Sequence, residues 1–163
     1  MNNILGRPSK DEYFMALAKA VSLRSIDPST KHGTVVVNRH GKILATGYNS
    51  PPSGFDDLRV PTTRPEKYLF FAHSERNAIF SAAQSGTALQ DCVFYVTGRP
   101  CIDCLQGIIQ VGARGVIFGE TQSHCVPNGQ MEDYLKYMLP TTKFKVADLY
   151  RDQHKSAFDY IYQ

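Results

Sequence analysis

Two short stretches contain the residues best suited to chemistry, HSE at 73–75 and PCIDC at 100–104. The first supplies the imidazole of His73 and the carboxylate of Glu75, and the second supplies the thiols of Cys101 and Cys104. If the stretches meet in space, one histidine and two cysteines form a three-ligand zinc site beside an acid. Three protein ligands leave a fourth tetrahedral position for water, as in catalytic rather than structural zinc sites. The residue types therefore predict a catalytic Zn²⁺ ion.

The spacing of these groups matches a hydrolytic reaction. Zinc can lower the pKa of its water from 15.7 to roughly 7. Two thiolates cancel the formal charge of the ion, so we expect weaker acidification here and assign Glu75 to take the water proton. Glu75 would then deliver that proton to a ring nitrogen and a leaving amine. HxE followed by PCxxC is the known signature of zinc deaminases, whereas CxxC alone also occurs in redox sites and zinc ribbons.

Both stretches are expected to begin helices. Apolar residues at helical spacing predict one helix over 73–85, ended by Gly86, and a second from Pro100 through Val111. The positive end of a helix dipole favours anions, which helps the cysteines reach the thiolate form that zinc requires. Pro100 suits a first helical position, because its missing N–H would be unpaired there.

The remaining pattern predicts an α/β fold. Ser9 and Glu12 form a capping box before a helix over 9–24, and a hairpin is expected over 33–48. Strand and helix patterns then alternate, which implies a largely parallel sheet with helices on its faces. The further expected strands cover 92–97, 116–118 and 144–147, and the further expected helices cover 131–139 and the region from 152.

The proline-rich segment 49–70 shows neither periodicity, so we expect a loop that borders the site. Its aromatic residues Tyr68 and Phe70, with Phe71, are expected to be site wall or core rather than a base-stacking platform.

Composition limits the function classes. The 163 residues favour one domain over 1–163, and the net charge of +3 comes from scattered basic residues, which argues against a nucleic-acid partner. No apolar run is long enough for a membrane span, and the N-terminal residues contain no signal-peptide core, so we expect a cytoplasmic protein. Cys92 is expected to be buried, while Cys125 beside His124 leaves a second metal site open.

The motifs resemble the deoxycytidylate (dCMP) deaminases of the cytidine deaminase-like superfamily. The similarity runs from about Phe14 to Phe118 and is carried by DPSTKHGTVVV, ILATGYN, RPEKYLFFAHSERNAI, CVFYVT and PCIDCLQGIIQVGARGVIF. It implies a three-layer α/β/α fold with a central five-stranded mixed sheet. It also implies zinc held by His73, Cys101 and Cys104, Glu75 as the proton shuttle, and hydrolysis of dCMP to dUMP and ammonia.

The resemblance extends to substrate and partners. Asn49 matches the position that holds the sugar, and Ser74 and Pro100 are expected at the pyrimidine. A nucleotide substrate and a homo-oligomer, often a hexamer in this family, are implied, as is regulation by dCTP and dTTP, with Mg²⁺ accompanying the regulatory nucleotide. Another cytosine- or guanine-type base, nucleoside or modified cytosine nucleotide is the alternative substrate. The cations considered for a phosphate are Arg64, Lys67, Arg76, Arg99 and His124.

Overall fold

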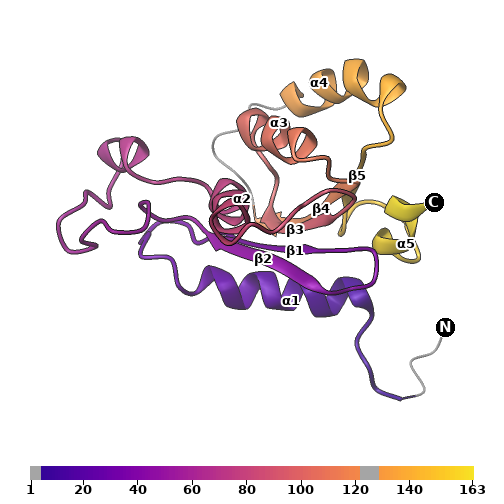
Figure 1. The fold of residues 1–163 in the computed structure, drawn as a ribbon, viewed down its shortest axis with the longest axis horizontal. Coiled ribbons are helices and arrows are strands. Elements are labelled where there is room, and N and C mark those ends of the chain that lie inside the picture. The colour runs from indigo at the N-terminus through magenta and orange to yellow at the C-terminus, as the bar shows by residue number, and fades with distance from the viewer. Residues whose placement is uncertain (1–4, 122–128) are drawn as a thin grey trace.

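A five-stranded sheet with the strand order β2-β1-β3-β4-β5 forms the centre of the fold (Figure 1). The computed structural model describes residues 5–121 and 129–163. The strands are β1 (Gly33–Val37), β2 (Ile43–Tyr48), β3 (Val93–Gly98), β4 (Gly115–Thr121) and β5 (Lys145–Asp148). The helices are α1 (Lys10–Ser22), α2 (Ser74–Ser85), α3 (Ile102–Gln110), α4 (Gln130–Met138) and α5 (Ala157–Tyr162), with 3₁₀ turns η1 (Glu66–Leu69) and η2 (Leu139–Thr141).

The sheet is mixed, which confirms the fold implied by the resemblance. β1 pairs antiparallel with both β2 and β3, whereas β3, β4 and β5 pair in parallel. The expectation of a largely parallel sheet therefore needs one correction, because β1 runs against the other strands and lies between two of them. The tight β1–β2 connection allows only antiparallel pairing, while α3 and α4 provide the long crossovers that parallel pairing needs.

Alternating side chains give the sheet two apolar faces. In β3, Phe94 and Val96 pack toward α2, α3 and α4, whereas Val93 and Tyr95 pack toward α1 and α5. Figure 1 shows α1 on one side of the sheet and α2, α3 and α4 on the other. Every residue of β3 is buried, so this strand anchors the two segments that precede and follow it, α2 and α3.

The predicted helix ends are largely confirmed. Ser9 caps α1 and Glu12 returns the capping-box bond, and Gly86 ends α2 with a φ of 69°. Pro100 is a correction: α3 begins at Ile102 with Cys101 as its N-cap, so Pro100 precedes the cap and is not the first helical residue. No helix in the described ranges is long and apolar enough to cross a bilayer.

The last helix starts later than expected, at Ala157 rather than near residue 152. Its first turn is held by Asp11 of α1, whose carboxylate accepts hydrogen bonds from the backbone N–H groups of Ala157 (2.7 Å) and Phe158 (3.1 Å). The Tyr95 hydroxyl donates a third bond to the same carboxylate at 2.8 Å. A buried carboxylate with three donors thus ties α5 to α1 and β3.

Gly47 lets β2 approach α2 with no side chain between them. A Cβ atom at position 47 would lie 2.3 Å from both the Ser74 carbonyl oxygen and the Ala78 backbone nitrogen. These are backbone atoms that cannot rotate away, so only glycine permits the observed contact. The contact lies at the first turn of α2, directly after His73.

Candidate metal centre and active site

His73, Cys101 and Cys104 meet at the N-termini of α2 and α3. His73 and Cys101 are the N-cap residues of these helices and have extended backbone conformations. The His73 Nδ1 atom lies 3.4 Å from the Sγ atoms of both cysteines, and the three ligand atoms lie within 4.8 Å of one another. Ligands around a tetrahedral zinc ion are separated by about 3.5–3.8 Å, given its usual bond lengths. The donor set and its spacing therefore fit zinc.

The ligands share protons when no metal is bound. A hydrogen bond from the Cys104 thiol, opposed by burial and supported by His73, lowers the pKa of Cys101 to about 4. The pKa of Cys104 is raised because this thiol donates to Cys101 and is buried. The hydrogen bond to Cys101 also raises the pKa of His73. The lowered pKa of Cys101 favours the thiolate form that a metal ligand needs, and metal binding releases the protons that the other ligands carry.

Glu75 lies in the first turn of α2 and is 5% exposed. Burial raises the pKa of its carboxyl group, and a raised pKa suits a group that takes and returns a proton near neutral pH. Glu75 and His73 line the same cavity, so the acid and the metal ligand face one space.

A buried chain of hydroxyl groups supports Glu75. The Ser74 hydroxyl lies 3.0 Å from Glu75 Oε2, to which it donates, and 2.8 Å from Thr34 Oγ1. Ser74 has one hydroxyl hydrogen, which goes to the carboxylate, so Thr34 of β1 is the donor in the second bond. Both hydroxyl side chains are fully buried. Thr34 gave no sequence signal of this role, because its contact with α2 depends on how the sheet and helix pack.

The cavity next to the cluster has a volume of about 270 Å³. Segment 49–70 contributes Asn49, Arg64, Lys67 and Tyr68 to its wall, which supports the expectation that this loop borders the site. Phe71 also lines the cavity, in keeping with its expected role as site wall. Pro100 is buried but is not among the lining residues, so its contact with a pyrimidine stays a prediction.

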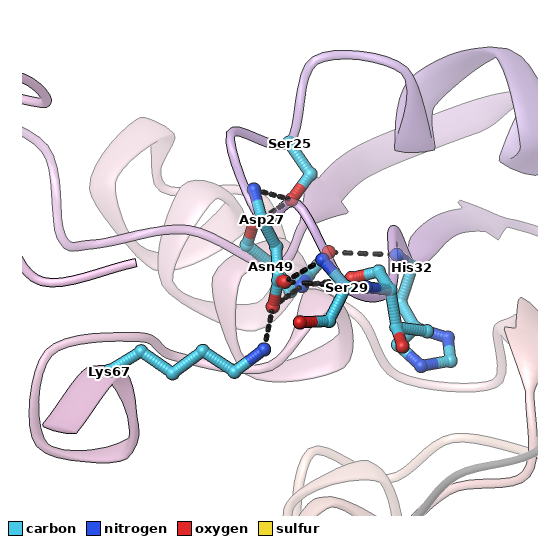
Figure 2. Close-up of polar contacts among 7 residues, drawn as sticks. Ser25, Asp27, Ser29, His32, Asn49 and Lys67 are labelled. Carbon is cyan, nitrogen blue, oxygen red and sulfur yellow. Dashed lines mark hydrogen bonds and ion pairs between the residues drawn. The ribbon is translucent and has the colours of Figure 1, made fainter. Parts of the chain in front are cut away.

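The cavity wall also contains a buried ion pair that the sequence did not reveal. Lys67 Nζ lies 2.6 Å from Asp27 Oδ2, and the two side chains are 4% and 5% exposed (Figure 2). Asn49 donates to the same Asp27 oxygen at 3.3 Å. Asp27 and Lys67 are 40 residues apart, so only the tertiary structure joins them. The one available signal was Asp27 in the DPSTKHG motif.

The other candidate cations surround the cavity differently. Arg64 and Arg76 are exposed, and Arg76 lies 5.6 Å from the centre of the Phe80 ring. Arg99 forms a 2.9 Å ion pair with Glu132 of α4. His124 lies outside the described residues, as does Cys125, so a second metal site there stays a prediction. Across 5–121 and 129–163, His73, Cys101 and Cys104 form the one cluster with metal-ligand geometry.

Comparison with known proteins agrees with this geometry. Residues 8–120 match the cytidine and deoxycytidylate deaminase zinc-binding region. The probable deoxycytidylate deaminase of Caenorhabditis elegans is 40% identical over 121 residues, covering 72% of this chain and 60% of that protein. The human deoxycytidylate deaminase is 38% identical over 119 residues, covering 69% of this chain and 66% of the human protein. The match thus spans less than two thirds of either relative.

A solved structure has the same fold. The dCMP deaminase from the cyanophage S-TIM5, crystallised in complex with dCMP and dUMP, aligns with a TM-score of 0.67 and 28% identity. The alignment covers 86% of this chain and 98% of the phage protein. The family match covers both predicted zinc-binding stretches and most of the sheet, and the structural match extends over most of the chain. The chain belongs to the family of cytidine and deoxycytidylate deaminases with a zinc-binding region.

Proposed function

We propose that this protein is a zinc-dependent deaminase that hydrolyses dCMP to dUMP and ammonia. The observation that carries the proposal is one cavity lined by His73, Cys101 and the buried carboxylate of Glu75, with Cys104 completing the ligand set. Deoxycytidylate deaminases at 38–40% identity support the choice of substrate. The S-TIM5 enzyme, whose structure contains dCMP and dUMP, supports it further.

The residues divide the work of the reaction. His73, Cys101 and Cys104 would hold Zn²⁺, which lowers the pKa of water and so supplies a nucleophile near neutral pH. The oxygen of water bonds to C4 of cytosine, the C4–N bond breaks, and the amine leaves as ammonia. Glu75 takes one proton from the water and gives it to the ring nitrogen, and then moves the second proton from the new C4 hydroxyl group to the leaving amine. The Ser74 hydroxyl keeps the carboxylate oriented during these transfers.

The cavity wall offers groups for the rest of the nucleotide. Asn49 is 6% exposed and lines the cavity, where its side chain would meet the sugar. Ser74 and Pro100 lie next to the metal ligands His73 and Cys101, where the pyrimidine would bind. Arg64 and Arg76 are the exposed cations of the wall and would meet the 5′-phosphate.

The proposal is tested by measuring ammonia release from dCMP, deoxycytidine, CMP, dCTP, cytosine, guanine and a short single-stranded oligonucleotide. We expect the rate of ammonia release to be much higher with dCMP than with deoxycytidine, because the site binds the 5′-phosphate. Equal rates on these two would reject a nucleotide substrate and leave the zinc chemistry standing. Guanine as the best substrate would reject the pyrimidine assignment altogether.

Assembly, regulation and compartment are part of the same proposal. We infer a homo-oligomer, with the hexamer as the expected form, whose turnover is regulated by dCTP and dTTP, with Mg²⁺ accompanying the regulatory nucleotide. Cys92, Cys101 and Cys104 are free thiols, in keeping with the cytoplasm. Light scattering, alone and with each nucleotide, measures the assembly. A monomer whose turnover of dCMP is insensitive to both nucleotides would reject the first two inferences.

A further inference from the structure

We propose that Asp27 and Lys67 are positioning residues that restrict Asn49 to the role of hydrogen-bond acceptor, so that the site selects a sugar hydroxyl at that point. This inference rests on the proposed function for the identity of the ligand. Its structural part, the engagement of the Asn49 amide by Asp27, can be measured without any substrate.

The contacts of Asn49 leave it little freedom. Its Nδ2 group donates one hydrogen to the Thr30 carbonyl oxygen at 2.9 Å and the other to Asp27 Oδ2 at 3.3 Å. Its Oδ1 accepts a bond from the His32 backbone N–H at 2.7 Å (Figure 2). An amide has two N–H donors and two acceptor lone pairs. Both donors are therefore used by the protein, and one Oδ1 lone pair remains for a ligand in the cavity.

Asp27 is held in place from two sides. Its Oδ1 accepts from the backbone N–H groups of Ser29 (2.8 Å) and Thr30 (3.2 Å), which fixes the local turn. Its Oδ2 accepts from Lys67 at 2.6 Å, and that oxygen is the one to which Asn49 donates. Lys67 thus keeps the carboxylate ionised and directed at the amide. Without this cation, a buried carboxylate would turn toward solvent or take up a proton.

Simple stabilisation is a weak explanation for this ion pair. Burying two opposite charges often gives no more stability than apolar side chains of similar volume. Asp27, Lys67 and Asn49 all line the cavity that contains Glu75 and His73. An ion pair at this place in the wall therefore has a consequence for the ligand. It excludes an N–H donor from the surface that meets the sugar, and a hydroxyl can donate to the remaining lone pair where a bare carbon cannot.

The substrate test compares dCMP with 2′,3′-dideoxycytidine 5′-monophosphate, which lacks only the 3′-hydroxyl. In the unaltered enzyme we expect kcat/KM to be about tenfold higher for dCMP, the effect of one hydrogen bond. In Asp27→Leu/Lys67→Met, which removes both charges together and so leaves no unpaired ion, we expect that preference to fall to about twofold. The loss should appear mainly in KM, because Glu75 and the metal ligands are untouched.

Three further variants separate this role from others. Lys67→Arg keeps the charge and should retain most of the hydroxyl preference, whereas Lys67→Met should lose it. Arg64→Met removes a cation from the same loop and the same cavity wall. Because we assign Arg64 to the 5′-phosphate, this variant should raise KM equally for dCMP and its dideoxy analogue and leave the hydroxyl preference intact. If Lys67→Met lowers the preference for dCMP over deoxycytidine but keeps the hydroxyl preference, Lys67 reads the phosphate and the inference is overturned. An equal loss on all substrates would also overturn it.

The engagement of the Asn49 amide by Asp27 is measured by ¹⁵N NMR, as the exchange of the Asn49 side-chain amide protons with solvent. The signal is assigned by its absence from the spectrum of Asn49→Asp. We expect both amide protons to be protected from exchange with solvent in the unaltered protein, and one to lose protection in Lys67→Met and in the double variant. Unchanged protection in both would reject the positioning role. Failure of the unaltered enzyme to deaminate dCMP, with the expected exchange pattern present, would reject the proposed function and not the engagement of Asn49.

Discussion

Ser74 donates a hydrogen bond to Glu75 Oε2 across 3.0 Å, although the two residues are adjacent in sequence and lie in the same first turn of α2. Thr34 from β1 is bonded to the same hydroxyl. The carboxylate to which we assign the proton transfer is thus oriented by its chain neighbour and, through it, by the sheet. This arrangement makes the contribution of a single buried hydroxyl group measurable.

Ser74→Ala should lower kcat for dCMP by about three- to tenfold, because the lost hydrogen bond contributes about 1 kcal/mol to the orientation of Glu75. KM and the zinc content should stay near their original values. Thr34→Val is the companion variant, and its effect on kcat should be smaller because Thr34 acts through Ser74. A Thr34→Val enzyme slower than Ser74→Ala would contradict this order of action. Steady-state kinetics with a colorimetric zinc assay provides both readings.

Glu75→Gln should retain zinc and lose turnover by a factor of about 10²–10⁴, the usual contribution of general acid–base catalysis. The variant should also be more stable than the unaltered protein at neutral pH. Burial raises the pKa of Glu75, so its ionised form costs stability once the pH exceeds its unfolded value. Ammonia release and thermal unfolding at pH 7 measure the two effects. Near-normal turnover would show that another group moves the proton.

Cys104→Ser should lose the metal and much of the folded stability, since the metal-bound form is the more stable one. Cys92→Ala is the matched control, because Cys92 is also a fully buried thiol but lies away from the cluster. Burial raises the pKa of Cys92 to about 12, so it remains a neutral thiol. The control should keep its zinc and lose only about 1 kcal/mol of stability. Metal content and melting temperature, with and without a chelator, distinguish the two variants.

Acid should weaken the fold through Asp27. Burial would raise the pKa of this carboxyl group, but hydrogen bonds from Lys67 and from the Ser29 and Thr30 N–H groups lower it further. Its contribution to stability is therefore fully present above the unfolded pKa of about 3.9 and is lost as the pH falls through the folded value. Urea unfolding at stepwise lower pH should show this loss. The variant Asp27→Asn/Lys67→Met should lack the part of this acid-induced loss that comes from Asp27. If the free energy of unfolding falls with pH in the same way in both proteins, the prediction is contradicted.

Asp11→Ala should cost about 3 kcal/mol, because three donors lose one buried acceptor. Tyr95→Phe removes a single one of these bonds and should cost about 1 kcal/mol. Amide exchange should show α5 opening in the alanine variant ahead of the rest of the protein. If α5 stays as protected as the sheet, Asp11 does not hold it. Chemical unfolding of the two variants gives the energies.

Local signals predicted the elements well, and the metal cluster with them. The capping box at Ser9, the stop at Gly86 and the two chemical motifs depend on residues close in sequence, whose physics is local. The start of α3 was predicted two residues too early, at Pro100 instead of Ile102, because the N-cap role of Cys101 is decided by its backbone conformation.

Pairings across the chain could not be predicted. Asp27 and Lys67 are 40 residues apart in the sequence, and Tyr95 and Asp11 are 84 apart. Without its partner in view, a charged residue in the sequence is most simply interpreted as a solvent-exposed one. The order of the strands was equally hidden, because the pattern of β1 is the same whichever neighbour it pairs with. The Asp27–Lys67 contact lies in the wall of the cavity, so the sequence indicated the chemistry of the metal cluster more fully than it indicated how a substrate is recognised.

Through the contact at Gly47, β2 sets the position of the first turn of α2 in the candidate active site, although no polar atom of β2 belongs to that site. The backbone of β2 touches the turn that carries Ser74 and follows His73, with no side chain to absorb a change. Any larger residue at position 47 must displace this turn relative to the thiols of α3. A single methyl group on the far side of a helix would thus alter the distance between imidazole and sulfur, and the protein would lose its metal with every ligand still in its sequence.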